Sequence, residues 1–264
     1  MISTRARAWL YPLTTVVALL AVWELAARLG WVPRYLLPSV SGIVVRTAEL
    51  RMLVLRELMV TLEETLLGFG LSVVVGVPLG YALVSWRAFN QAIYPLLIGS
   101  QVVPKVALAP LFLLWFGFGL TAKALIAFLV AFFPIVVNSA VGLASIESEK
   151  LDVARAAGAS GLQLFWLARL PNALPMIFGG MKVSITLAVV GALVAEFIAA
   201  ENGIGRLLLN ANGNMDTELL FGGILALVAL GVILYLAMEA AERLLLPWHI
   251  SQRVQPGTRL EAAP

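Results

Sequence analysis

The side chains of this chain that could do chemistry are few, and almost none is a nucleophile or a metal ligand. The 264 residues include no cysteine and a single histidine, His249. A thiol nucleophile, a disulfide framework and a cysteine metal site are therefore excluded, and a histidine-based triad or metal site would need an unusual design. Neither the Walker pattern GxxxxGK nor the zinc pattern HExxH occurs. We expect no enzyme activity, no resident metal or cofactor and no nucleotide bound by a Walker loop.

Lysine and glutamate side chains lie instead inside long apolar stretches. Ionisable groups at membrane depth are costly, and they usually face the interior of a helix bundle or water. Lys105 is expected near the middle of one span, between two prolines that should kink its helix. Lys182 and Glu196 share a face of another span and sit roughly 21 Å apart by helical rise. We interpret these charges, with two polar residues, as the lining of a translocation path or its gate: Lys105, Asn138, Lys182, Thr186 and Glu196.

A second interpretation of these charges stays open. The lysines could extend to a membrane interface, and Glu196 could pair with Arg206 or lie among the outer headgroups. Glu24 and Glu239 lie close to expected helix ends, so we expect them to be interfacial or to pair helices. The net charge of +3 is too small and too scattered to suggest nucleic-acid binding.

A third polar feature is the segment LDVARAAGASGLQLFWLARLP, residues 151–171, which separates two of the longest uncharged stretches. Its first part favours helix, and Gly158 can end that helix in the left-handed conformation. Ser160 and Gln163 have the spacing of a capping box, which restarts a helix, and Pro171 is expected to stop it. The sequence predicts a helix-turn-helix bracket, the name used below for residues 151–171.

The bracket has one apolar face, because Leu162, Phe165 and Trp166 are spaced i, i+3, i+4. We expect these three residues to hold the bracket against its own membrane domain. Two interpretations remain open for the segment as a whole. It either rests as an amphipathic loop on the lipid headgroups, or it docks a soluble partner and passes movement into the span that follows Pro171.

The elements that must position these residues are membrane-spanning helices. The chain is 61% hydrophobic and 12% charged, against roughly 45–50% apolar and 25% charged in soluble domains. Its apolar residues run continuously, without the alternation of a barrel strand. We predict an all-α polytopic bundle of about six spans, in which glycines such as Gly68, Gly70, Gly76 and Gly80 allow close helix approach. The spans are expected near 9–29, 60–86, 92–117, 121–146, 172–199 and 218–246.

The remaining segments complete the expected organisation. We expect the first helix to stay uncleaved, although a cleaved signal peptide is the alternative. Ser39 or Ser41 could cap an amphipathic surface helix before residue 60. The expected division is 1–59 for the first span and the surface helix, 60–248 for a core with a cytoplasmic loop at 146–171, and 249–264 for a cytoplasmic tail. A weak arginine and lysine bias places the N-terminus and the bracket in the cytoplasm.

The bracket resembles the loop motif of binding-protein-dependent ABC importer permeases, which reads EAA, three residues, G, nine residues, I, one residue, LP. Asp152 takes the acidic position and Ala168 the isoleucine position, and the spacing matches throughout. The blocks PKVALAPLFLLWFG, FFPIVVN, LPNALPMIFGGMK and VAEFIAAENGIG are similar to those of the nitrate, sulfonate and taurine group. The resemblance covers roughly residues 60–248.

What the resemblance implies is a permease with the type I ABC importer fold, in the bacterial inner membrane, paired with a second copy of itself. Two ATPase subunits, which would bind the ATP, would grip the bracket from the cytoplasm, and a periplasmic or lipid-anchored binding protein would deliver the cargo. The outer-loop glycines Gly203 and Gly205 are expected to shape a turn that this protein touches. The residues carried over to the coupling role are Asp152, Val153, Ala154, Arg155, Gly158, Leu170 and Pro171.

The sequence leaves the cargo and two alternative functions open. Lys105 and Lys182 near the expected path favour an anionic cargo such as nitrate, a sulfonate or taurine, whereas related permeases also carry pyrimidine vitamin precursors or flavins. A self-sufficient ion-coupled carrier would use Lys105 and Glu196 as ion sites. A membrane scaffold without transport would need neither.

Overall fold

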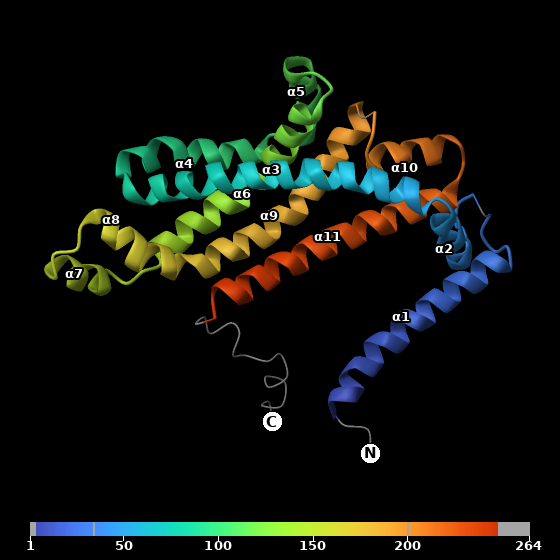
Figure 1. Ribbon diagram of the computed structural model, residues 1–264, viewed down its shortest axis with the longest axis horizontal. Helices are drawn as coiled ribbons and strands as arrows, with labels where there is room; N and C mark the ends of the chain where they lie inside the picture. Colours follow the sequence, from blue (N-terminus) through green and yellow to red (C-terminus); the bar gives the residue numbers. More distant parts are fainter. Residues whose placement is uncertain (1–3, 34, 200, 248–264) are drawn as a thin grey trace. The chain divides into compact units, whose positions relative to one another are not determined.

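The computed structural model describes residues 4–33, 35–199 and 201–247, and every regular element in these ranges is helical (Figure 1). The expected tail 249–264, with His249, lies outside the described residues. Contacts group the chain into two units: residues 1–60 with 200–229, and residues 61–199 with 230–264. The two long helices α3 (Arg51–Ser85) and α11 (Thr217–Leu245) each begin in the first unit and end in the second.

The expected all-α membrane bundle is confirmed. Within the described residues, four helices are long and apolar enough to cross a membrane, and a sharply bent helix pair makes up to five. The 25-residue helix α1 (Thr4–Arg28) adds a further element whose side chains are only partly described. The expected start of the second span near residue 60 was wrong, because α3 already begins at Arg51. Arg51, Arg56 and Glu57 therefore belong to that long helix, and the separate amphipathic helix is only α2 (Val40–Glu49).

The larger unit is built around the packed pair α6 (Leu120–Ala144) and α9 (Leu170–Ala199), which lie side by side in Figure 1. Alanines at the contact are fully buried, among them Ala127, Ala131 and Ala188. The second half of α3 also packs closely on α6. A Cβ on Gly68 would lie 2.5 Å from the Cβ of Ala127. Gly76 and Gly80 are equally close to α6, whereas Gly70 faces open space, so three of the four expected glycines act as predicted.

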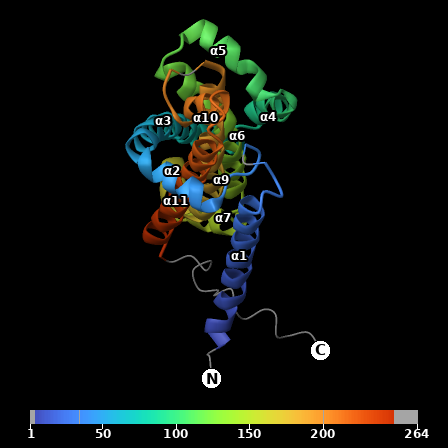
Figure 2. The same ribbon diagram turned by 90° about the vertical axis from the view of Figure 1, so that its right-hand side faces the viewer.

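The span expected at 92–117 is not one helix. It consists of α4 (Arg87–Val102), the 3-10 turn η1 (Lys105–Leu108) and α5 (Ala109–Phe116), and the two parts are bent by 90°. Figures 1 and 2 both show α5 turning away from α4. The break falls at Pro104, which lacks a backbone donor and pushes the preceding residue to extended geometry, as Val103 shows with ψ 122°. The sequence predicted a kink here but not a full break.

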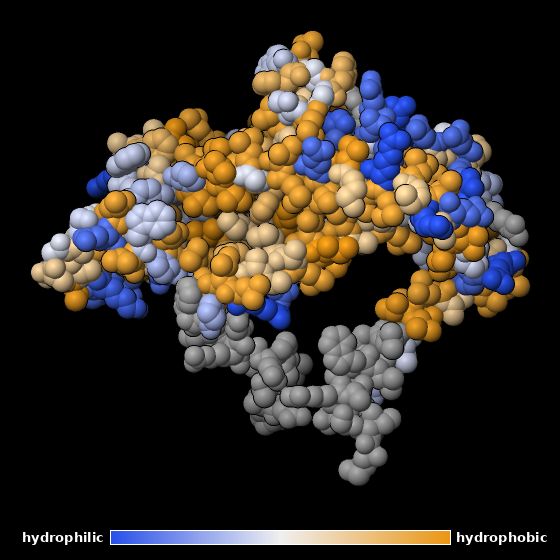
Figure 3. Space-filling model, viewed as in Figure 1, coloured by the Kyte–Doolittle hydropathy of each residue, from blue (hydrophilic) through white to orange (hydrophobic). Residues whose placement is uncertain are grey.

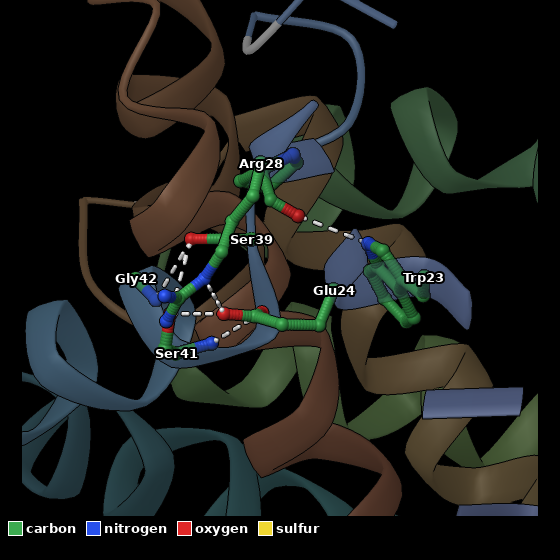
Figure 4. Close-up of polar contacts among 7 residues, drawn as sticks. Trp23, Glu24, Arg28, Ser39, Ser41 and Gly42 are labelled. Atoms are coloured by element: carbon green, nitrogen blue, oxygen red, sulfur yellow. Dashed lines mark hydrogen bonds and ion pairs between the residues drawn. The ribbon is translucent and has the colours of Figure 1, made fainter. Parts of the chain in front are cut away.

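In the smaller unit, α1 is tied to α2 by a cluster of polar contacts (Figure 4). Ser39 caps α2, and the Glu24 carboxylate accepts hydrogen bonds from the Ser41 hydroxyl (2.6 Å) and the Ser41 amide (3.1 Å). Arg28 donates to the same carboxylate, and the Trp23 indole donates to the carbonyl of Pro38. The interpretation of Glu24 as a helix-pairing residue is therefore confirmed.

The segment after residue 200 contains a helix that the sequence did not predict, α10 (Ile204–Gly213). The turn expected at Gly203 is present, with φ 115°, but Gly205 lies inside the helix. Arg46 donates to Asp216 through two nitrogens, at 3.0 and 2.8 Å, and so joins α2 to the start of α11. Partial burial would raise the pKa of Asp216, but hydrogen bonds from Arg46 and from the Leu219 amide outweigh it and hold the pKa below its usual value.

Candidate functional site

The bracket folds as the sequence predicted in its first half. It begins within α7 (Ser148–Ala156), and Gly158 follows in the left-handed region with φ 85°. The helix α8 (Gly161–Leu164) then starts at a complete capping box. The Ser160 amide donates to the Gln163 side chain at 2.8 Å, and the Gln163 amide donates to the Ser160 hydroxyl at 3.4 Å. These local contacts fix the turn without help from the rest of the chain.

The polar face of the bracket is open to contact. Asp152 and Arg155 form an ion pair at 3.0 Å, and their side chains are 69% and 56% exposed. Val153 between them is 71% exposed, whereas Leu151 is buried and anchors α7. Figure 3 shows hydrophilic residues gathered where α7 and α8 lie, next to an apolar surface over the long helices. An exposed surface that is half charged and half apolar is suited to a protein partner.

The expected apolar face is only partly used. Phe165 packs edge-on against Tyr81 of α3, with ring centroids 4.5 Å apart, and joins the core cluster around Leu143. Leu162 and Trp166 are 69% and 58% exposed, so the prediction that they hold the bracket to its own domain was wrong. The reason is that α8 is a single turn followed by a π-helix, η2 (Phe165–Arg169), so the regular 3.6-residue face does not continue.

Pro171 does not stop the helix, contrary to the prediction. The π-helix leads directly into α9, and the amide of Leu170 donates to the carbonyl of Phe165, five residues back. Pro171 is the second residue of α9 and directly follows the π-helix, where the hydrogen bonds of the chain already reach five residues back. The bracket is therefore continuous with a span that runs from Gly161 to Ile198.

A buried charge cluster lies between α3, α6 and α9. Glu64 is fully buried, and its carboxylate binds the ammonium of Lys123 at 2.7 Å. Glu196 is 1% exposed, accepts a hydrogen bond from Thr61 at 2.6 Å, and has its carboxyl group against that of Glu64. The buried Glu64 carboxyl group therefore contacts both the Lys123 ammonium and a second carboxyl group, that of Glu196.

Sequence reasoning found only Glu196 of this cluster. The alternative that places its side chain among the outer headgroups was wrong, because the side chain is buried against Thr61. Its pairing with Arg206 stays a prediction. Sequence reasoning missed Glu64 and Lys123 because both were placed at span ends, where charges are ordinary. The available signal was the second glutamate of TLEETLLG, which stands on the apolar side of a helix that starts earlier than predicted.

Lys182 lies in a separate cluster. Its ammonium forms an ion pair with Glu242 of α11 and lies 6.0 Å from the ring centroid of Tyr235. The side chain is 20% exposed, and the alternative in which it extends to a membrane interface stays a prediction. Glu239, expected to be interfacial or to pair helices, bonds Arg243 of its own helix.

Lys105 stands at the break between α4 and α5 rather than in the middle of a helix. Its ammonium lies 6.0 Å from the ring centroid of Phe133 on α6. No carboxylate of the described part of the chain pairs with it. Asn138 donates to the carbonyl of Pro134 and Thr186 to that of Val183, so both polar residues bond their own helices.

No group of three or more histidine, aspartate or glutamate side chains within the described ranges could hold a metal ion. Three features of the described residues could serve a function: an exposed bracket joined to a span, buried ion pairs between helices, and Lys105 beside the ring of Phe133.

Comparison with known proteins identifies close relatives along most of the chain. Residues 68–248, more than half of the chain, match the family model described as binding-protein-dependent transport system inner membrane component. The riboflavin transport system permease protein RibX of Chloroflexus aurantiacus is 38% identical, covering 90% of this chain and 89% of the relative. The formylaminopyrimidine transport permease protein ThiX of Halalkalibacterium halodurans is 36% identical, covering 92% and 97%. The putative aliphatic sulfonates permease SsuC of Escherichia coli is 32% identical, covering 96% of each.

A solved structure shares the fold. The methionine ABC transporter MetNI in inward-facing conformations matches with a TM-score of 0.65 and 19% identity, covering 74% of this chain and 97% of the solved chain.

Proposed function

This chain belongs to the family of binding-protein-dependent transport system inner membrane components, and from that premise we propose what it carries and how it is driven. It is a permease subunit of an ABC importer in the bacterial inner membrane, and it is not an enzyme. The family implies a separate ATPase and a binding protein as partners. We propose that its cargo is a planar nitrogen heterocycle of the pyrimidine or flavin type.

The observation that carries this choice is the pairing of Lys182 with Glu242. An anionic cargo was favoured by two lysines near the expected path, and the Glu242 carboxylate neutralises one of them. Lys105 then remains, beside the ring of Phe133. A cationic donor next to an aromatic face suits a flat ring that stacks and accepts a hydrogen bond. The relatives named for formylaminopyrimidine and riboflavin support the same class.

A sulfonate is the second candidate, and Lys105 favours it. An ammonium without a carboxylate partner attracts an anion, and one relative is named for aliphatic sulfonates. The two candidates differ in what Lys105 contributes. Replacing it would abolish uptake of an anion that needs its charge, but would only weaken uptake of a ring held mainly by stacking.

The cargo is tested with the binding protein that partners this permease. Calorimetric titration with formylaminopyrimidine, riboflavin, taurine and an alkanesulfonate is expected to show submicromolar binding for one of the heterocycles only. Uptake into proteoliposomes of the full complex should then fall several-fold in Lys105→Gln and persist in part. Tight binding of a sulfonate together with complete loss of uptake in Lys105→Gln would reject the heterocycle in favour of the anion.

We further propose that two copies of the chain form the path and that the ATPases grip the exposed face of the bracket around Asp152, Val153 and Arg155. Continuity of α8 with α9 supports this, since a push on α8 passes directly into a span, and α7 joins α8 through the short turn at Gly158. Leu170 packs into the core around Leu143, and Pro171 lies in the first turn, so they would act as the fixed end of the lever.

Crosslinking tests the grip and the copy number together. The chain has no cysteine, so Val153→Cys gives each permease copy a single thiol at a known position. We expect it to crosslink to the ATPase, and the complex mass to contain two permease copies. Uptake that proceeds in ATP-free vesicles would instead support an ion-coupled carrier.

A further inference from the structure

A hollow lies between the end of α3 and the bracket, and it shares Arg155 with the face that we propose for the ATPases. Its volume is about 390 Å³, and its walls include Tyr81 and Ser85 from α3 and Arg155, Leu164, Phe165 and Arg169 from the bracket and the π-helix. Two of these residues are cationic, and no acidic residue lines the hollow.

Polar groups at the hollow are left without partners. The hydroxyl oxygen of Ser85 is buried and has no hydrogen-bond partner. Arg169 is half-buried, and its guanidinium forms no ion pair with any carboxylate of the described residues. Arg155 bonds Asp152 through one terminal nitrogen, Nη1, so its other donors remain available. Buried polar groups in proteins are nearly always satisfied, so such a group calls for an explanation.

A bound phosphate would satisfy all three groups. Guanidinium groups match the geometry of phosphate oxygens with two parallel donors, and charge-assisted hydrogen bonds are stronger than neutral ones. The ring of Phe165, packed on Tyr81, supplies an apolar wall for the carbon part of a ligand. Ligand pockets typically measure roughly 300–1,000 Å³, so the hollow has room for a phosphate and a small attached group.

We propose that this hollow binds a phosphate-bearing anion, which bridges the end of α3 to the bracket. The anion has two sources, the headgroup of an anionic phospholipid or a free phosphate compound in the cytoplasm. Exposed aromatic and apolar side chains stand close in sequence to its walls: Trp86 and Trp166 are 62% and 58% exposed, and Leu167 is 78% exposed. Tryptophan is enriched at membrane interfaces, where anionic headgroups lie.

The consequence for transport rests on the proposed function of the bracket. An anion held by Arg169 and Ser85 would stiffen the joint between α3 and the π-helix, because it would link two elements that now meet only through side-chain packing. Coupling between ATP hydrolysis and uptake would then depend on the anion. Binding itself does not depend on that role.

The test uses the purified permease–ATPase complex in nanodiscs. One arm compares phosphatidylcholine with a mixture containing about one quarter phosphatidylglycerol. The other arm adds inorganic phosphate to phosphatidylcholine discs against chloride at equal ionic strength. The readouts are the thermal midpoint and the lipid retained in native mass spectrometry. The variants are Arg169→Gln and Ser85→Ala, and the control is Arg87→Gln, an exposed arginine that does not line the hollow.

We expect one addition to raise the midpoint of the wild-type complex, and the apparent affinity to fall by about tenfold or more in Arg169→Gln, the scale of one lost charge-assisted contact. Ser85→Ala should weaken binding several-fold without harming the fold, and Arg87→Gln should bind as the wild type does. A response to phosphatidylglycerol alone identifies a lipid, and a response to phosphate identifies a soluble ligand.

No response in either arm, or equal losses in Arg169→Gln and Arg87→Gln, would overturn the proposal. Failure of the bracket's coupling role would be seen differently, as loss of ATP-driven uptake in every lipid while anion binding persists.

Discussion

At the scale of single residues, burial of charged side chains carries a large desolvation free energy in this protein. Glu64 and Lys123 lose their hydration when they are buried. Their 2.7 Å contact offsets this desolvation penalty only while both partners are present. Glu196 adds a second carboxyl group, held by Thr61. This cluster links three helices. Its contribution to stability depends on the balance of its charges rather than on any single hydrogen bond.

Lys123→Met should be strongly destabilising, because it leaves the fully buried Glu64 carboxylate without its ammonium partner. We expect a loss of about 3–5 kcal/mol, the range found when one partner of a buried pair is removed. Intrinsic tryptophan fluorescence during thermal unfolding in detergent measures it. The double variant Glu64→Gln/Lys123→Met should recover much of the loss, and additive losses in the double variant would contradict a coupled pair.

The Arg46–Asp216 pair should make stability depend on acid. The pKa of Asp216 lies below its usual value of 3.8 in the folded protein. A lowered folded pKa gives stability that is fully present above the usual value and is lost as the pH falls through the lower, folded value. Thermal midpoints measured from neutral pH down to about pH 3 should therefore drop more steeply for the wild type than for Asp216→Asn. Parallel curves for the two proteins would show that the pair does not carry the effect.

At the scale of elements, the bracket is determined by its own residues. Gly158 takes a backbone conformation that other residues avoid, and the capping box restarts the chain in the correct direction. The break at Pro104 is determined locally in the same way. The path of the chain after each turn or break depends on packing against other helices. The continuation of the helix through Pro171 is an example.

Gly158→Ala tests whether the bracket needs its turn. A Cβ at this position meets no atom within 4 Å, so the cost is only backbone strain, about 1 kcal/mol or somewhat more. We expect normal membrane insertion but several-fold lower ATP-driven uptake in proteoliposomes. Gly161→Ala is the matched control, since it is also in open space but has no positive φ. Equal uptake by the two variants would show that the turn geometry is not needed.

At the scale of the whole molecule, the chain has apolar helices to cross a membrane, an exposed bracket, and no nucleotide-binding loop. The family to which the chain belongs implies a separate ATPase subunit as a partner. The exposed bracket is the surface that we propose for it.

The purified chain alone should neither bind nor hydrolyse ATP, whereas the complex with its ATPase should do both. Photolabelling with an azido-ATP analogue checks this, because label should attach to the ATPase band only. Label on the permease that is competed by ATP would show that the chain contributes to the nucleotide site.

Much of the fold could be predicted from the sequence. Long apolar runs identified α6, α9 and α11, and the three close-packed glycines of α3 were read correctly. The helix α10 was missed because its mixed residues and flanking glycines resemble a loop. Of the predicted path residues, Lys105 and Lys182 were recognised as unusual, but their surroundings were not predictable.

The sequence by itself determined what depends on neighbouring residues: the apolar spans, the left-handed turn at Gly158, the capping box and the spacing of the coupling motif. Only the tertiary structure decided which charges meet. Lys123 and Glu64 are 59 positions apart, and Thr61 and Glu196 are 135 positions apart. Their contacts depend on how far each helix is rotated and shifted against the next, which the packing of many small side chains sets together.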